Sequence, residues 1–205
     1  MRRREMLEFA VLGLLHDSPL HGYELRRRLN TRLGVFRALS FGTLYPCLAS
    51  LQSQGLVSVD RDEPVTTASR RQRITYTLTD EGRAAFAARA DLSDPASWED
   101  NAFDVRLAFF ARTERHVRLR ILEGRRARLA ERLAALRDER SEETGLDQWT
   151  AALHAQREDA VDRAVTWIDE LIDTERRAPR GRAGALTDPT HPAFNPPTQP
   201  PIKEN

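Results

Sequence analysis

The sequence predicts a mostly α-helical protein of the α+β class, with a small β-hairpin in its first half and antiparallel long helices in its second half. Three observations support this fold class. Apolar residues recur at helical spacing up to residue 55, alternation with a period of two follows on both sides of a polar loop, and helical spacing returns after residue 102. The length of 205 residues allows one sizeable domain or two small ones.

Three helices are expected before the hairpin. Residues 7–15 are apolar at almost every position, as in a short helix that is buried on most sides. A second helix has one apolar stripe and a basic face, and a third helix turns its leucines inward and ends near Gly55. The stripe of the second helix consists of Leu25, Leu29 and Leu33. Ahead of the first helix, the arginines Arg2, Arg3 and Arg4 could form a flexible arm.

Two strands are expected at residues 57–60 and 74–78, where apolar and polar side chains alternate. The polar loop between them, residues 62–72, ends in closely spaced arginines. Thr79 or Asp80 can then cap a further helix by accepting hydrogen bonds from its free backbone NH groups. Three helices followed by strand, loop and strand describe a winged helix-turn-helix, in which the third helix enters the major groove of DNA beside the loop.

The polar segment 91–101 is predicted to connect a first domain, residues 1–90, to a helical domain, residues 102–178. The second domain is expected to contain a short buried helix and two long helices that are separated at Gly145. Residues 179–205 are rich in proline and poor in apolar partners, so they cannot offset their chain entropy by burial. We therefore expect a disordered tail.

The two long helices have apolar seams with steps near three and four residues. These seams could pack against each other within one subunit or interlock with a second subunit. We expect both, because a helix of about 27 residues spans about 40 Å and is too long for its own small domain to cover. The residues predicted to contribute to a homodimer interface are Leu119, Leu122, Leu129, Leu133, Leu136, Leu153, Trp167 and Leu171.

Charge is divided unevenly along the chain, although the net charge is only +1. Residues 1–90 contain 14 arginines and nine acidic residues, whereas residues 91–178 contain 15 arginines and 20 acidic residues. A basic first half attracts a polyanion such as a nucleic acid. The single cysteine, Cys47, is expected to be a small buried hydrophobe, and together with the lack of a signal sequence it predicts a cytoplasmic protein. No apolar run is long enough to predict a membrane span.

Short motifs and their spacing resemble the PadR-like family of regulators. Residues 19–25, PLHGYEL, resemble the start of that family's second helix, and residues 42–46, GTLYP, resemble its recognition helix. The segment 76–82, YTLTDEG, follows at the expected distance, so the likeness covers about residues 7–90. The helices of the second half are similar to a dimerisation extension of actinobacterial-type members. Phe41 departs from the many relatives that have proline there, and we expect it to alter only how the helix begins.

The resemblance implies binding to double-stranded DNA. Free NH groups and hydroxyls at the start of the third helix can hold phosphates or reach base edges, and cations of the wing loop gain salt-dependent affinity. The predicted DNA contacts are Tyr23, Ser40, Gly42, Thr43, Tyr45, Pro46, Arg70, Arg71 and Arg73. Alternatively, Ser40 only caps the helix, Tyr45 packs locally, and the wing arginines form a solvated turn. One of the arginines Arg26, Arg27 and Arg28 could also contact a phosphate.

The three tryptophans, Trp98, Trp149 and Trp167, allow two interpretations. They could line a pocket for a small-molecule effector, because aromatic-lined dimer interfaces can hold flat apolar ligands. They could instead pack in the core, which is the interpretation we prefer. A ligand between subunits would act by changing the spacing of two recognition helices.

The sequence contains no nucleophile with an oriented base, no metal-ligand spacing and no glycine-rich phosphate loop. No enzyme activity, metal or cofactor is therefore predicted, and His21 is expected to make a local hydrogen bond. The predicted function is sequence-specific transcriptional regulation by a homodimer on a palindromic operator, with repression as the family tendency. The alternative is a protein-interaction module that keeps the winged-helix scaffold without binding specific DNA.

Overall fold

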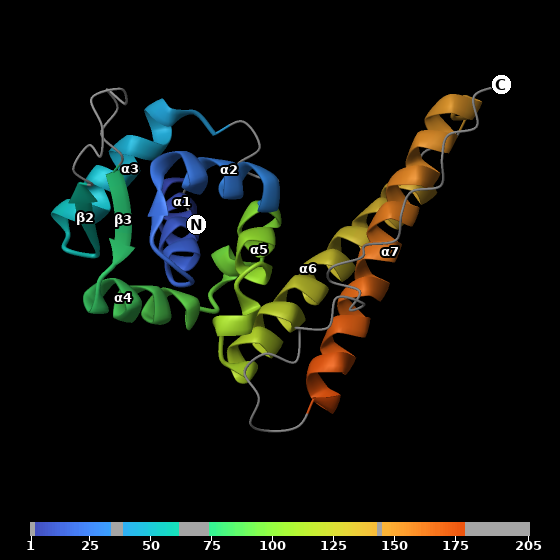
Figure 1. Ribbon diagram of the computed structural model, residues 1–205. Helices are drawn as coiled ribbons and strands as arrows, with labels where there is room; N and C mark the ends of the chain where they lie inside the picture. Colours follow the sequence, from blue (N-terminus) through green and yellow to red (C-terminus); the bar gives the residue numbers. More distant parts are fainter. Residues whose placement is uncertain (1–2, 34–38, 62–73, 143–144, 179–205) are drawn as a thin grey trace. The chain divides into compact units, whose positions relative to one another are not determined.

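The computed structural model describes residues 3–33, 39–61, 74–142 and 145–178. The chain divides into two compact units, Met1–Thr113 and Glu114–Asn205, which we describe separately (Figure 1). None of the described helices is long and apolar enough to cross a membrane. Within the same residues, no group of three or more histidine, cysteine or acidic side chains is placed to hold a metal ion.

The first unit contains the predicted winged helix-turn-helix. Its helices and strands are α1 (Arg3–Leu15), β1 (Leu20–His21), α2 (Gly22–Arg32), α3 (Phe41–Ser53), β2 (Val57–Arg61), β3 (Ile74–Leu78) and α4 (Asp80–Ala90). The sheet is antiparallel with the order β1-β3-β2, and Tyr76 of β3 lies opposite both Leu20 and Val59. The two-residue strand β1 was not predicted. Residues 62–73, the tip of the hairpin, lie outside the described residues.

Helix α1 passes through the middle of the first unit, and every side chain from Met6 to Leu15 is buried. Phe9 stacks on Phe86 of α4, with the ring centroids 5.0 Å apart. The prediction of a helix buried on most sides is confirmed. The helix begins earlier than residue 7, so Arg3 and Arg4 belong to its first turn and do not form a flexible arm.

The joint between the hairpin and α4 depends on Thr79 and Gly82. The hydroxyl of Thr79 accepts a hydrogen bond from the amide of Gly82 at 2.9 Å and donates one to the carbonyl of Gly55 at 2.8 Å. Thr79 is therefore the N-cap, one of the two residues proposed for that role. A Cβ at position 82 would lie only 2.1 Å from the carbonyl oxygen of Leu56, so this close approach requires glycine.

The compact first unit extends well beyond residue 90. After α4 the chain forms the 3-10 helix η2 (Pro95–Trp98), α5 (Asp100–Leu107) and the 3-10 helix η3 (Phe110–Arg112). Ala102, Val105 and Phe109 lie in the hydrophobic core of this unit. The ring of Phe109 fills the space that Gly13 leaves open, because a Cβ there would be 2.4 Å from it. The division between units thus follows Thr113, whereas a polar connection was predicted at residues 91–101.

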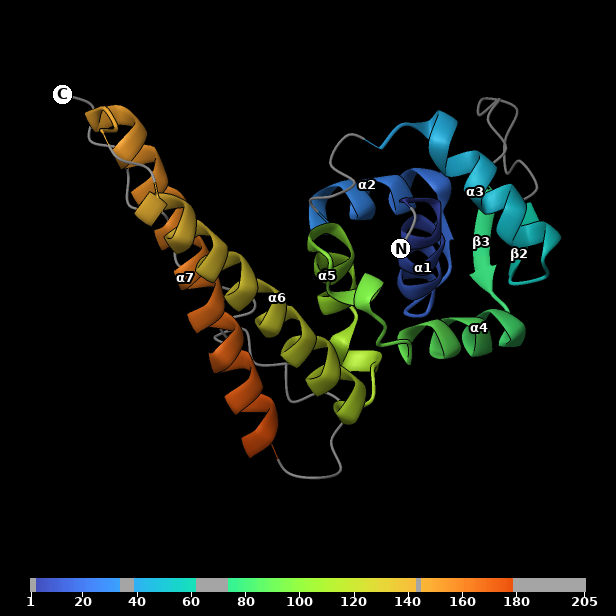
Figure 2. The same cartoon turned by 180° about the vertical axis from the view of Figure 1, so that it is seen from behind.

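The second unit is a hairpin of two long helices, α6 (Arg115–Glu142) and α7 (Gln148–Arg177). Figure 2 shows them side by side along their length. They are antiparallel, because Arg137 near the end of α6 pairs with Glu158 at 2.9 Å, while Glu123 near its start pairs with Arg176 at 2.8 Å. The predicted antiparallel long helices are confirmed, and the tail 179–205 lies outside the described residues.

The residues predicted for the homodimer interface differ in exposure within this hairpin. The buried ones are Leu122, Leu129, Leu133 and Leu171. Leu119, Leu136 and Trp167 are half-buried, and Leu153 is exposed. The interpretation of the seams as intramolecular packing therefore applies to the buried leucines, whereas Leu153 presents apolar surface outward.

Candidate nucleic-acid interface

Helix α3 has one buried face and one open face. Leu44, Cys47, Leu48 and Leu51 are buried and anchor the helix to the first unit. The predicted DNA-contact residues at its beginning all lie on the open side; they are Ser40, Gly42, Thr43, Tyr45 and Pro46. The structure therefore brings these five predicted residues together on one exposed surface, which we call the α3 face.

The backbone at the start of α3 leaves donors open. Ser40 is the N-cap residue, and its carbonyl accepts hydrogen bonds from the amides of Thr43 and Leu44, both at 3.2 Å. The amides of Phe41 and Gly42 have no acceptor within the helix, as at any helix start. The Ser40 side chain does not cap the helix but lies 3.2 Å from the Thr43 hydroxyl. Two amides and two hydroxyls are thus grouped where an anionic group can be held.

Gly42 and Pro46 leave backbone groups at the beginning of α3 accessible or without a hydrogen-bond partner in the helix. A Cβ added at Gly42 would meet only the Ser40 hydroxyl, at 3.7 Å, so a ligand can approach the backbone closely. Pro46 is the sixth residue of the helix, in its second turn and not in the first turn. Because proline has no NH, the carbonyl of Gly42 lacks its usual intrahelical donor.

Tyr45 joins the two motifs that carry the family resemblance. A Cβ at Gly22, the first residue of α2, would lie 3.2 Å from the Tyr45 ring, so the glycine makes room for that ring. The other neighbour of Tyr45 is Phe41, stacked on it with the centroids 5.5 Å apart. Although it packs on both, Tyr45 keeps 46% of its surface exposed, and Tyr23 is 63% exposed. Tyr45 therefore packs locally and still has a side chain that is partly open to solvent.

The arginines of α2 have different partners. Glu24 accepts hydrogen bonds from Arg28 at 2.9 Å and from Arg27 at 3.1 Å, and these bonds lower the pKa of its carboxyl group. The guanidinium of Arg26 instead lies over the ring of Phe41, 4.1 Å from its centroid. Such a cation–π contact stabilises by about 0.5–1 kcal/mol at an exposed site. The wing arginines Arg70, Arg71 and Arg73 lie outside the described residues.

Arg26 and Phe41 were not among the predicted contacts. The spacing that places them beside Gly22 and Tyr45 is visible in the sequence. Arg26 follows Gly22 by four residues on α2, and Phe41 precedes Tyr45 by four residues on α3. Residues at this spacing share a helix face. The register in which the two faces meet depends on the turn between the helices, and spacing alone does not give it.

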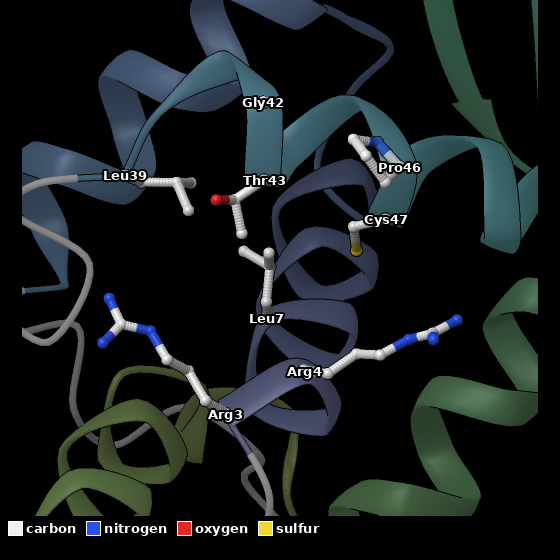
Figure 3. A pocket seen from close by; sticks show the side chains of 8 residues that line it. All are labelled: Arg3, Arg4, Leu7, Leu39, Gly42, Thr43, Pro46 and Cys47. Carbon is white, nitrogen blue, oxygen red and sulfur yellow. The ribbon is translucent and has the colours of Figure 1, made fainter.

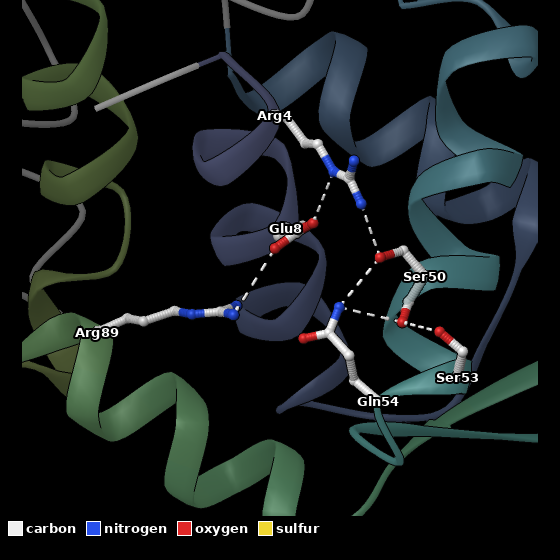
Figure 4. Close-up of polar contacts among 6 residues, drawn as sticks. All are labelled: Arg4, Glu8, Ser50, Ser53, Gln54 and Arg89. Atoms are coloured by element: carbon white, nitrogen blue, oxygen red, sulfur yellow. Dashed lines mark hydrogen bonds and ion pairs between the residues drawn. The ribbon is translucent and has the colours of Figure 1, made fainter.

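A polar network fixes α3 against two other helices (Figure 4). Glu8 of α1 pairs with Arg4 at 3.1 Å and with Arg89 of α4 at 3.7 Å. Arg4 also donates to the Ser50 hydroxyl of α3 at 2.8 Å, and Gln54 donates to the same oxygen at 3.0 Å. The nearly buried carboxylate of Glu8 thus has two cationic partners, as burial of a charge requires.

A pocket of about 450 Å³ lies between the beginning of α1 and the α3 face. Leu7, Leu39 and Cys47 provide apolar lining, and Arg3 and Arg4 stand at its edge (Figure 3). Burial raises the pKa of the Cys47 thiol to about 12, so the thiol is neutral at ordinary pH. The prediction that Cys47 is a small buried hydrophobe is confirmed.

The remaining candidates are distributed over the chain. Nδ1 of His21 lies 3.3 Å from the carbonyl oxygen of Ile74 and 3.1 Å from the hydroxyl of Thr75, so the hydrogen bonding predicted for His21 is made to β3 and not locally at the helix start. Trp98 ends η2 and is half-buried. Trp149 is 76% exposed and Trp167 is half-buried. Both lie on α7, about 27 Å apart along the axis, so α7 of a single chain does not bring them into one pocket.

Comparison with known proteins identifies the first unit. Residues 11–88 match the family described as "Transcriptional regulator PadR-like family". The "Negative transcriptional regulator PadR" of Bacillus subtilis is 30% identical over 78 residues, which are 38% of this chain and 41% of that protein. The chain thus matches less than half the length of this relative.

Two solved structures of Bacillus subtilis PadR are also similar. The complex with operator DNA is 19% identical and has a TM-score of 0.41, with 82% of this chain and 98% of the other covered. The complex with p-coumaric acid is 17% identical and has a TM-score of 0.38, with 87% and 99% covered. The helix order, the glycine-supported contact between α2 and α3, and the match over residues 11–88 agree, and residues 11–88 of this chain form a PadR-like domain.

Proposed function

We propose that this protein is a sequence-specific DNA-binding transcriptional regulator that acts in the cytoplasm and represses by occupying a palindromic operator as a homodimer. The observation that carries the proposal is the α3 face, where open amides, two hydroxyls and an exposed tyrosine are grouped within a PadR-like domain. The designation of the Bacillus subtilis relative as a negative regulator supports repression.

In this proposal the beginning of α3 enters the major groove. The amides of Phe41 and Gly42, with the hydroxyls of Ser40 and Thr43, hold backbone phosphates, and Tyr45 reaches phosphate or base edges. Tyr23 and the wing arginines add contacts on either side. A winged helix reads only a few base pairs, so useful specificity needs two copies on one operator.

The apolar surface of α7 supports homodimerisation. Trp149 and Leu153 are four residues apart near the beginning of α7, and both are exposed. Exposed large apolar side chains grouped in this way are typical of interaction sites. Replacing both with serine is expected to shift the protein from dimer to monomer in light scattering after gel filtration. A dimer of unchanged stability would contradict this assignment.

A small-molecule effector is a further part of the proposal. The indole of Trp149 is exposed among the described residues and is thus accessible to a ligand, whereas the half-buried Trp98 and Trp167 fit the core interpretation as well. Bacillus subtilis PadR has been crystallised with p-coumaric acid, which provides a first ligand to titrate. Separate replacement of the three tryptophans should abolish the fluorescence response in at least one variant. An unchanged response in all three would count against an effector site at these residues.

The central experiment is a gel shift with the DNA upstream of the protein's own gene at two salt concentrations. Specific binding should weaken steeply with salt, because phosphate contacts release counterions. The Thr43→Ala and Tyr45→Ala variants should each bind more weakly than wild type, while Gln52→Ala, an exposed change nearer the end of the same helix, should not. Failure of the wild-type protein to distinguish this DNA from random sequence would favour the interaction-module alternative.

A further inference from the structure

The face shared by α2 and α3 contains a continuous stack of one cation and two aromatic rings. The order is Arg26, Phe41 and Tyr45, with distances of 4.1 Å from the guanidinium carbon to the Phe41 centroid and 5.5 Å between the two ring centroids. Gly22 of α2 lies next to the Tyr45 ring, where a Cβ would come within 3.2 Å of it. The stack is half-buried at Arg26 and Phe41 and opens to solvent at Tyr45.

We infer that Arg26 is a phosphate-binding residue of this interface and that Phe41 is the positioning residue that holds its guanidinium beside the recognition helix. This inference rests on the proposed function, because the phosphate is that of the DNA bound by the α3 face. It assigns a role to the one arginine of α2 that stacks on a ring, and to an aromatic residue at the helix start.

The arginines of α2 differ in whether a carboxylate matches their charge. Arg27 and Arg28 both bind the carboxylate of Glu24, so most of their charge is already matched within α2. Arg26 has no carboxylate partner among the described residues. A guanidinium that faces a ring instead of an acid keeps its full charge available for a phosphate.

The contact with Phe41 leaves the Arg26 guanidinium able to bind an anion. The guanidinium carbon of Arg26 lies over the Phe41 ring, and a guanidinium held on a ring face still has N–H groups that can match the oxygens of a phosphate. Stacking also restricts the rotamers of a long side chain before the ligand arrives, which reduces the entropy lost on binding. The same stack ends at Tyr45, so Arg26 and the α3 face belong to one continuous surface.

Arg26 and Phe41 lie where the two helices of the helix-turn-helix meet. Arg26 lies one turn after Gly22 on α2, and Phe41 is the first residue of α3, next to the open amide of Gly42. In a helix-turn-helix the second of the two helices enters the groove while the first crosses the phosphate backbone. The cation that α2 brings to the start of α3 is therefore expected at the backbone.

The test compares Arg26→Ala with Arg27→Ala, which removes the same charge one residue away. Binding of both variants and wild type to the upstream DNA is measured by fluorescence anisotropy over a series of salt concentrations. Arg26→Ala should bind about tenfold more weakly for each Arg26 that contacts a phosphate, the loss expected for one charge-assisted hydrogen bond. The slope of log affinity against log salt should fall by about 0.9 for each Arg26 that contacts a phosphate. Arg27→Ala should match wild type in both measurements.

Two further variants separate the positioning role from simple folding. Arg26→Lys keeps the charge but loses the planar guanidinium and its N–H groups, so the salt slope should persist while the affinity falls. Phe41→Leu keeps apolar bulk but removes the ring, and it should weaken binding in the same way with wild-type circular dichroism. If Phe41→Leu changes thermal stability but leaves affinity intact, the stack is only structural and the positioning role is overturned.

Equal losses in Arg26→Ala and Arg27→Ala would overturn the inference, because they would indicate a general charge effect. Wild-type affinity in Arg26→Ala would overturn it as well, while leaving the proposed function in place. If the wild-type protein itself shows no specific, salt-dependent binding, the proposed function fails and this inference falls with it.

Discussion

The α6–α7 hairpin and the α3 face use polar groups in opposite ways. In the hairpin, arginines are matched to acids or to the carbonyl groups at the end of α7. The pairs are Arg115 with the carbonyls of Glu175 and Arg176, Arg118 with Glu175, Arg126 with Asp169, Arg137 and Arg140 with Glu158, and Arg176 with Glu123. On the α3 face, amides and hydroxyls are left without a charged partner among the described residues, and so is the guanidinium of the neighbouring Arg26. The first arrangement favours stability and the second leaves capacity to bind a ligand.

The strongest way to test this contrast is Arg118→Leu in the hairpin. Arg118 and Glu175 are 2.9 Å apart, and both side chains are almost completely buried. Removing one partner leaves a buried carboxylate without its cation, which should cost about 3–5 kcal/mol in the free energy of unfolding measured with urea. Arg177→Ala breaks an exposed pair with Asp173 and should cost less than about 0.5 kcal/mol. Similar losses in both variants would contradict the contrast.

The closely packed interior of the first unit should not tolerate an added methyl group, and Gly82→Ala tests this. The new methyl group would collide with the Leu56 carbonyl, a backbone atom that cannot move independently. We expect a loss of about 1–3 kcal/mol in the free energy of unfolding, the usual cost of overpacking. A thermal melt that does not change would mean that the joint at Thr79 and Gly82 adjusts more easily than its geometry indicates.

Gly42→Ala is the matching change on the α3 face and should have the opposite consequence. Open space surrounds this position, and alanine favours a helix over glycine, so thermal stability should be retained or raised. The methyl group would nevertheless keep a phosphate away from the helix start, and DNA affinity should fall about tenfold. If the Gly42→Ala variant is destabilised, or binds DNA as tightly as wild type, Gly42 and Gly82 do not have the different roles proposed here.

The smallest effect concerns Cys47, the buried residue beneath the α3 face. Because burial raises its pKa from 9.0 to about 12, the folded state retains the thiol proton more strongly than the unfolded state. This contribution to stability is complete below about pH 9 and is lost as the pH rises towards 12. Alkylation by iodoacetamide at pH 8.5 should be far slower in folded than in urea-unfolded protein. Rapid alkylation of the folded protein would contradict the raised pKa, and Cys47→Ala should lack this part of the pH dependence.

Much of the fold could be predicted because helical and strand periodicity is visible along the chain. The alternation around Val57 and Ile74 predicted the hairpin, and the seams ending at Leu136 and Leu171 predicted the long antiparallel helices. The two-residue strand β1 could not be predicted, because two residues have no period and their pairing with Tyr76 is a long-range contact. The extent of the first unit was also not predicted. The polar segment after residue 90 indicated a domain end, whereas Phe109, further along the chain, packs in the core of the same unit.

The sequence by itself determined which helix faces are apolar, that Thr79 or Asp80 caps the helix after the hairpin, and which motifs match the PadR-like family. These properties depend on neighbouring residues and on backbone geometry, so they can be read along the chain. Only the tertiary structure decided that Arg26 lies on Phe41 and that Gly22 receives Tyr45. Such contacts depend on how two helices are set against each other across a turn, and a small rotation of either helix would pair different side chains.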